Sequence, residues 1–365
     1  MSEQEIHVGE RKDETIAAES NAAPPRPQRI VLTLVTGFAL LIFSLFLSLT
    51  TGIFPISYAE FWEVLFSSNP DPLLKEVVYQ TRMPFALDML LLGGGLAVSG
   101  TLLQLRIANP FASPTLTGLM PGAMVGLCVV LLLGMNIDSF GGMALCIAGA
   151  VFGGFIVFTL NRIRFIRGRS AGIHLFMIGF IIDVALRSIS GFIVLLGENQ
   201  QEWAMSVGGW GIREGSFTFW LTLVTLLVAG SVFAFPKQLK PLYIPFAIVL
   251  TAITVWACGT IGYIGLIVPY FMRCMIGNRP RLLLLGSILW GGGLLMLAKV
   301  ISARIHEPVG LPLTPVLACI GIPLLIFMMW REWQRSSMLE NGKFRTLLAR
   351  ASNSIFLCYI LYIKK

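Results

Sequence analysis

The sequence predicts an all-α, polytopic membrane protein with about ten transmembrane helices. Hydrophobic residues make up 56% of the 365 residues and charged residues only 13%, which excludes a soluble domain of ordinary size. Apolar runs of about 20 residues, the helical length that crosses a hydrocarbon core, fill almost the whole chain. The runs lack the alternation of a membrane β-barrel, so helices are the structure that satisfies their backbone in lipid.

The predicted spans follow one another with short polar turns between them. In order they are Ile30–Thr50, Met83–Leu105, Leu116–Met135, Gly141–Leu160, Ala171–Leu196, Phe217–Phe235, Leu242–Ile261, Leu282–Ile301 and Leu311–Trp330. A shorter apolar piece, Gly265–Met275, contains Pro269 and is predicted to be a short return helix. The glycines from Gly259 to Gly265 supply the tight reversal before it, because glycine permits positive φ and close backbone approach.

Both ends of the chain are more polar than its middle. Residues 1–29 are rich in Ala, Glu and Pro, show no cleavable secretory signal and are predicted to form a disordered cytoplasmic tail. The transmembrane domain is placed at residues 30–335. Residues 336–365 are predicted to form a cytoplasmic or interfacial tail, because their apolar stretch is too short to span a membrane.

Basic residues sort by turn, and this predicts the orientation in the membrane. One alternate set of turns carries Arg106, Arg162, Arg164, Arg167, Arg169, Lys237, Lys240, Arg273, Arg279 and Arg281, whereas the other set carries fewer basic and more acidic residues. Because cytoplasmic loops are enriched in Lys and Arg, the first set is predicted to be cytoplasmic, together with both termini.

Several classes of function are disfavoured by composition. The formal net charge is +8, but Lys and Arg are scattered at span ends and form no basic face for a nucleic acid. The six cysteines lie mostly within apolar runs without a CxxC pair, so they are interpreted as small apolar side chains, and no metal site or cofactor is predicted. No phosphate-cradling GxxxxGK[ST] loop occurs, so any ATP hydrolysis is expected on a separate subunit.

Three blocks of less common residues occur in a fixed order. They are Arg82-Met83-Pro84 with Gly94-Gly95-Leu96-Ala97-Val98-Ser99-Gly100 and Asn109-Pro110-Phe111-Ala112, then Gly259-Thr260-Ile261-Gly262-Tyr263-Ile264-Gly265 with Pro269, and finally Leu311-Pro312 with Ile320-Gly321 and Pro323. In this order and spacing, the chain resembles the permease subunit of ABC importers for ferric siderophores, haem and cobalamin.

The resemblance implies a type II importer permease bundle in the bacterial inner membrane, paired with a second permease copy as a homodimer or heterodimer. It implies a cytoplasmic ABC ATPase dimer that binds ATP and an extracytoplasmic binding protein that delivers substrate. The chain itself would be a transport subunit and no enzyme. The function implied is ATP-driven import of a ferric siderophore or a related metal-organic nutrient.

The resemblance also suggests roles for single residues. Arg82 and Arg304 match outer-face arginines that dock the binding protein, with interfacial snorkelling as the alternative. Contact with the ATPase is assigned to Asn109, Pro110, Arg162, Arg164, Arg167, Arg169, Lys237 and Lys240, although Asn109 and Pro110 also suit the start of a helix. The translocation path is assigned to Gln104, Gly262, Gly265 and Pro269, with interhelical hydrogen bonding as the alternative for Gln104.

The chain departs from the family pattern in one large and several small ways. The coupling segment expected between the sixth and seventh spans is missing, since Phe235 leads directly through Pro236 to Pro241 into the next span. Phe85, Lys299 and Gly310 replace an Arg, an Asp and a Glu of the family. Three explanations stay open: other turns dock the ATPase, a complete partner permease does so, or the chain is a decayed copy that no longer pumps.

Two other functions compete with ATP-driven import. A secondary transporter driven by an ion gradient needs carboxylates within the membrane, and the candidates are Asp88 and Asp183. Asp183 and Arg187 are spaced i and i+4 and are interpreted first as a local ion pair, then as path residues. A membrane enzyme is the weakest alternative, because no nucleophile and base or metal-ligand constellation occurs near any turn.

Overall fold

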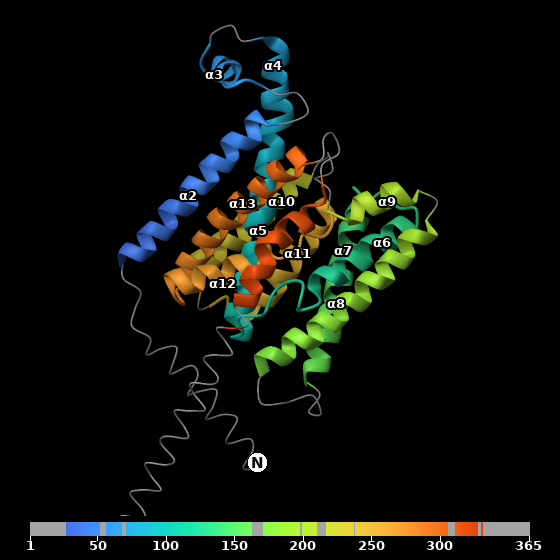
Figure 1. Cartoon of the computed structure of the whole chain (residues 1–365). Helices are drawn as coiled ribbons and strands as arrows, with labels where there is room; N and C mark the ends of the chain where they lie inside the picture. The colour runs from blue at the N-terminus through green and yellow to red at the C-terminus, as the bar shows by residue number, and fades with distance from the viewer. Residues whose placement is uncertain are drawn as a thin grey trace, which may run out of the picture. The chain divides into compact units, whose positions relative to one another are not determined.

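The computed structural model of the chain describes residues 27–51, 56–67, 71–162, 171–197, 199–209, 217–236, 238–305, 311–327 and 330. Within these ranges the regular structure is entirely helical. The chain divides into two compact units, Met1–Leu317 and Ala318–Lys365. The first unit contains most of the predicted spans, and Figure 1 shows its helices in the colours of the chain.

The helices of this unit are, in chain order, α2 (Pro27–Thr50), α3 (Tyr58–Phe66), α4 (Pro72–Glu76), the π-helical turn η1 (Val77–Arg82), α5 (Met83–Ile107), α6 (Leu119–Leu132), α7 (Phe140–Arg162), α8 (Ala171–Leu196), α9 (Gln200–Val207), α10 (Phe217–Ala234), the 3₁₀ turn η3 (Lys240–Leu242), α11 (Tyr243–Cys258), α12 (Ile264–Ile276) and α13 (Pro280–Ile305). A further apolar helix covers Leu313–Phe327.

The predicted spans correspond to helices of the structure. Six helical segments among the described residues are long and apolar enough to cross a membrane, and four shorter apolar helices lie at Leu119–Leu132, Val224–Ala234, Ile264–Ile276 and Leu313–Phe327. The all-helical membrane fold is therefore confirmed, whereas the total of about ten spans stays a prediction. The predicted return helix is present as α12, which contains Pro269.

Two boundaries differ from the sequence prediction. The second span does not begin at Met83, because α4, η1 and α5 form one continuous helical segment from Pro72 to Ile107, started by Asp71 as N-cap and Pro72 in the first turn. The third span begins at Leu119 and not at Leu116, because the chain turns through residues 110–118 first. Gly118 ends that turn with φ +80°, a value that glycine adopts without a steric penalty.

The short helix α3 lies between α2 and α4 and is fixed by local hydrogen bonds. The Ser57 hydroxyl accepts from the Glu60 backbone N–H, and the Glu60 carboxylate accepts from the Ser57 N–H, which together form a capping box. The hydrogen bonds from Ser57 lower the pKa of the Glu60 carboxyl below its ordinary value. This helix was not predicted, because nine residues are too few to give a clear periodic signal.

Helix α5 lies at the centre of the bundle, with α2, α10, α11, α12 and α13 against it (Figure 1). Its glycines allow this close packing. A Cβ at Gly93 would overlap the carbonyl of Gly291 in α13, and a Cβ at Gly100 would overlap the carbonyl of Gly265 in α12. These glycine-rich stretches are therefore surfaces at which the helices pack closely.

A second group of helices, α6, α7 and α8, packs by the same device. Gly118 and Gly122 of the α6 region approach Gly153 and Gly149 of α7, and Gly179 of α8 approaches the carbonyl of Leu116. Because residue numbers rise in α6 as they fall in α7, the two helices are antiparallel. This group lies beside the α5 group in Figure 1, joined to it through α11, which also contacts α6 and α7.

Helix directions place the turns at two opposite ends. Contacts of Gly93 with Gly291 and of Thr101 with Ser287 show that α5 and α13 are antiparallel. The start of α5 therefore lies beside the end of α13, which we call the Arg304 end. The end of α5, the starts of α6 and α11 and the end of α7 lie at the other side, which we call the Arg162 end.

Candidate functional site

The predicted site residues separate between the two ends. Arg82 and Arg304, the predicted docking arginines, both lie at the Arg304 end. Asn109, Pro110, Arg162 and Lys240, predicted to contact an ATPase, lie at the Arg162 end. Four further residues of that prediction, Arg164, Arg167, Arg169 and Lys237, lie outside the described residues. Among the described residues, those predicted to dock a binding protein thus lie at one end of the bundle, and those predicted to contact an ATPase lie at the other.

The two docking candidates differ in their exposure. Arg82 is only 8% exposed, and its Nη1 donates a hydrogen bond of 2.6 Å to the carbonyl of Leu49 in the last turn of α2. A cation is favourable there, because the last carbonyls of a helix carry partial negative charge. Arg304 is exposed at the end of α13. Arg82 therefore fixes the end of α2, while Arg304 is open to a partner.

The Asn109–Pro110 turn at the Arg162 end has a different structure from the helix start that was predicted. The Asn109 side-chain oxygen accepts from the Phe111 backbone N–H at 3.0 Å, which forms an Asx turn. Helix α6 begins only at Leu119, with Gly118 as its N-cap. The prediction that Asn109 caps the next helix is wrong, because the turn continues for several residues before a helix can start.

The connection from α10 to α11 is short and closed by its own contacts. Arg281 Nε donates to the carbonyl of Phe233 at 2.9 Å and Nη2 to that of Ala234 at 3.3 Å, so it caps the end of α10. Its guanidinium also lies 5.8 Å from the centre of the Phe233 ring. The Tyr243 hydroxyl donates to the carbonyl of Pro236 at 2.6 Å. These contacts hold the end of α10 and the start of α11 on either side of the short connection.

Three of the predicted path residues meet at one packing junction. Pro269 has no N–H to donate to the carbonyl of Gly265, four residues earlier in α12. Gly100 of α5 approaches this same carbonyl, a geometry suited to a Cα–H···O contact. Gln104 is fully buried, and its Nε2 donates to the carbonyls of Pro110 at 3.0 Å and Leu266 at 3.4 Å. Interhelical bonding is thus what Gln104 does in this structure, and its role in a path stays a prediction.

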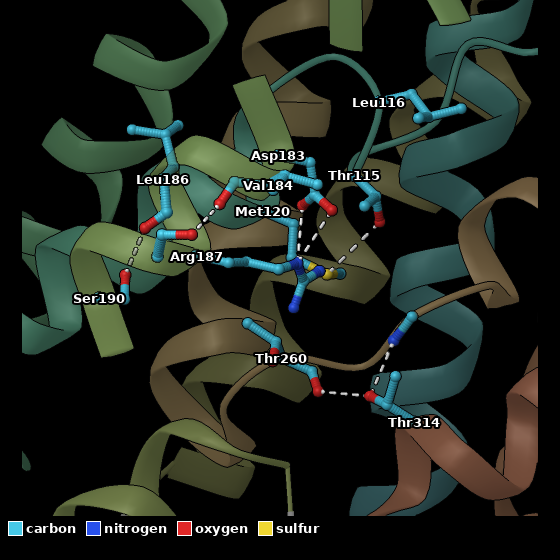
Figure 2. A network of polar contacts seen from close by, with 12 residues as sticks. Thr115, Leu116, Met120, Asp183, Val184, Leu186, Arg187, Ser190, Thr260 and Thr314 are labelled. Atoms are coloured by element: carbon cyan, nitrogen blue, oxygen red, sulfur yellow. Dashed lines mark hydrogen bonds and ion pairs between the residues drawn. The ribbon is translucent and has the colours of Figure 1, made fainter. Parts of the chain in front are cut away.

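The fourth predicted path residue, Gly262, lies in the break between α11 and α12. Gly259 has φ +76° and Tyr263 φ +71°, so the chain reverses sharply here, as the glycine pattern predicted. The freed backbone groups find partners from elsewhere: the Thr260 N–H donates to the carbonyl of Val207, and the Thr314 hydroxyl donates to that of Thr260 at 3.1 Å. Figure 2 shows the Thr260 and Thr314 contact. Irregular backbone within an apolar bundle needs such partners.

The predicted pair on α8 is confirmed. Arg187 Nε donates to both carboxylate oxygens of Asp183, at 2.9 and 3.0 Å. Asp183 lies on the side of α8 that packs against α6, and Figure 2 shows the pair together with Met120 of α6. The arrangement places a charged group in the middle of an apolar helix, where such groups face a partner or water.

Two residues that depart from the family pattern meet in space. Lys299 Nζ lies 5.7 Å from the centre of the Phe85 ring, a cation–π distance, with α5 and α13 packed together at this point. Sequence reasoning recorded each residue separately and missed the contact. The available signal was that both substitutions occur on spans with facing glycine runs.

The FecCD transport family matches residues 40–242 and 235–331, two segments that meet in the α10–α11 turn. The iron(3+)-hydroxamate import system permease protein FhuB of Bacillus subtilis is 24% identical over 350 residues, which cover 89% of this chain and 90% of that protein. The vitamin B12 import system permease protein BtuC of Yersinia pestis is 29% identical over 311 residues, covering 80% and 90%.

A solved structure agrees with the fold. An inward-facing putative metal-chelate type ABC transporter superposes with a TM-score of 0.65 at 21% identity, covering 82% of this chain and 98% of that one. At this level of identity the likeness concerns the fold alone. The family match extends over most of the bundle described above, and the chain therefore belongs to the FecCD transport family, as a multi-pass membrane permease of the ABC importer type.

Proposed function

We propose that this chain is the permease subunit of an ATP-driven importer of a ferric siderophore or a related metal-organic nutrient. The observation that carries the proposal is the family match across the whole bundle, from residue 40 to residue 331. The relatives named for iron(3+)-hydroxamate and vitamin B12 import support a bulky metal-organic cargo. In this proposal the cargo comes from an extracytoplasmic binding protein, and a cytoplasmic ATPase dimer supplies the driving force.

The two ends of the bundle support a division between these partners. The Arg162 end gathers Arg162, Lys240 and further basic residues, as expected for a cytoplasmic surface. The Arg304 end offers an exposed guanidinium that suits bidentate pairing with a carboxylate of a binding protein. A second permease copy, identical or complete, would complete the pore.

The short α10–α11 turn bears on how the ATPase is seated. Since Arg281 and Tyr243 close this turn, an ATPase would have to contact the 108–118 turn, the end of α7 and Lys240. Pairing with a complete permease is the second arrangement, and a decayed copy is the third. We favour the first, because the turn residues Asn109 and Phe111 are held in one conformation by the Asx turn.

The test is co-purification and reconstitution. The tagged chain is co-expressed with an ABC ATPase and a binding protein from the same genome, purified in mild detergent and reconstituted into liposomes for uptake of radioactive iron in a hydroxamate chelate. We expect both partners to stay bound and uptake to require ATP. An ATPase that never stays with the chain would contradict coupled import by this polypeptide.

Matched charge reversals sharpen this test. Arg162→Glu with Lys240→Glu is expected to weaken ATPase retention and leave the binding protein bound, whereas Arg304→Glu is expected to do the reverse. All three side chains are exposed, so the bundle should remain folded. Loss of both partners in either variant would contradict the assignment of one partner to each end.

A secondary transporter is the competing proposal. Its two carboxylate candidates are buried, and Asp183 is already bound by Arg187. Uptake that continues when ATP is depleted, while the proton gradient is held, would favour this alternative.

A further inference from the structure

The Asp183–Arg187 pair lies deep within α8. This helix runs for 26 residues, from Ala171 to Leu196, and Arg187 stands nine residues before its end. At about 1.5 Å per residue, that end is about 13 Å away. The guanidinium does not reach toward it, since Nε is bound to Asp183, one turn in the opposite direction. Snorkelling to the nearer interface is therefore excluded for Arg187 in this conformation.

The pair is only partly covered by protein. The Asp183 side chain is 13% exposed and that of Arg187 is 30% exposed. Only Nε of the guanidinium hydrogen-bonds within the described part of the chain, and it is directed at Asp183. The two Nη groups remain open to a ligand. A cation with open donors at the middle of a span is costly against lipid, so this side of α8 faces water or a polar ligand.

The surface on either side of Arg187 has a defined character. Phe176 and Phe180 stack on each other at 6.3 Å on the turns below it, and Phe111 meets Phe176 edge-on at 5.8 Å. One turn above, Gly191 has nothing within 4 Å of the position where a Cβ would stand. Phe176, Phe180, Arg187 and Gly191 are spaced by four or seven residues and share one face of the helix. Along this face, aromatic rings thus precede Arg187 in the chain, and open space lies at Gly191 after it.

We propose that Arg187 is a cargo-contacting residue that binds an anionic oxygen group, such as a free carboxylate, of the transported chelate. The two free Nη groups provide the planar donor pair that suits such an anion. Asp183 is a positioning residue, because it holds Nε and thereby fixes the direction of the guanidinium. The identity of the anion as cargo rests on the proposed function, whereas the anion site itself does not.

The site can be tested without knowing the cargo. In a background with the native cysteines replaced, the Gly191→Cys variant is exposed in membrane vesicles to an anionic and a cationic methanethiosulfonate of equal size. The measured quantity is the ratio of the reaction rate of the anionic reagent to that of the cationic reagent. We expect this ratio to be several-fold higher at the introduced thiol than for a free thiol in solution. Arg187→Gln should abolish that preference. An introduced thiol that reacts with neither reagent, or a preference that persists without Arg187, would overturn the proposal.

Two further variants serve as controls for this experiment. Arg187→Gln alone leaves the Asp183 carboxylate without its partner, so Asp183→Asn with Arg187→Gln removes both charges and keeps two groups that can hydrogen-bond. It should show the same loss of preference. Gly230→Cys, at another open glycine on α10, serves as the control position. Its reactivity should be unchanged by the Arg187 variants, and a parallel change there would overturn a local effect.

Uptake separates this inference from the proposed function. In the reconstituted importer, Asp183→Asn with Arg187→Gln should lower uptake of ferric citrate relative to a neutral ferric trihydroxamate by severalfold. An equal effect on both chelates would overturn selection by charge. If the unaltered complex imports neither chelate while the thiol preference stands, the proposed cargo class is wrong and the anion site remains.

Discussion

Helices α5 and α8 are both apolar spans that carry an aspartate, but the two helices differ in how much of their surface other helices cover. Of the most apolar stretch of α5, 83% is buried inside the bundle, against 33% for α8. In α5 the polar groups bond to other helices: Ser99 bonds to Ala247 and Thr251 of α11, and Thr101 to Ser287 of α13. In α8 they bond within the helix, as Arg187 does to Asp183 and Ser188 to Val184.

This difference in burial indicates different roles for the two helices in one bundle. A helix whose glycines and hydroxyls are all engaged by neighbours holds the fold and has little surface left for a ligand. A helix whose charges are satisfied internally can present an open face without unfolding. The comparison predicts that equal substitutions will act on stability in α5 and on ligand behaviour in α8.

The largest expected effect comes from adding one methyl group to each helix. Gly100→Ala in α5 would place a Cβ into the carbonyl of Gly265, so we expect a loss of about 3 kcal/mol, the upper end for overpacked sites. The Cβ of Gly191→Ala in α8 would meet open space, so this variant should lose no stability and should gain at most about 1 kcal/mol. Unfolding in mixed detergent micelles, followed by circular dichroism, measures both. Equal losses would contradict the contrast.

A smaller effect is expected at the two arginines of the Arg304 end, which sharpen the contrast between buried and open groups. Arg82→Met removes the hydrogen bond to Leu49 and should destabilise the bundle by about 2 kcal/mol, as for buried charged donors. Arg304→Met removes an exposed side chain and should change stability by less than about 0.5 kcal/mol. Thermal unfolding measures both. A stable Arg82→Met variant would contradict a stabilising role for the bond to Leu49.

The same contrast shows which features the sequence could predict. Local patterns were sufficient for the apolar spans and for the Asp183–Arg187 pair, because residues four apart in a helix lie side by side. The burial of Arg82 depended on a carbonyl 33 residues away, and the closure of the α10–α11 turn on Arg281, 48 residues from Phe233. Such partners follow from tertiary packing, which no local pattern encodes.

The turn after α5 shows the same limit at shorter range. Asn before Pro suits both a helix start and an Asx turn, and the choice was made by Gly118 and by the packing of Pro114 against Gly265. The path residues were chosen from the resemblance alone. In the structure Gln104, Gly265 and Pro269 lie where α5 and α12 pack together. The polar group that stays open is Arg187 on α8, for which the sequence predicted an ion pair first and a role in the path second.

The smallest expected effect separates hydroxyls that bond between helices from those that bond within one. Ser99→Ala removes contacts of 3.0 Å to the carbonyl of Ala247 and 2.8 Å to the Thr251 hydroxyl. Interhelical hydrogen bonds in membrane proteins average about 0.6 kcal/mol and reach roughly 1.7, so we expect a loss of about 1 kcal/mol. Ser188→Ala removes only a bond to Val184 on an exposed face and should leave the unfolding midpoint unchanged.

Adding Thr251→Val to Ser99→Ala should cost less than the sum of the two single changes, since both remove the same contact. Additive losses would mean that the two hydroxyls act independently and that their contact with each other adds nothing to the stability of the bundle.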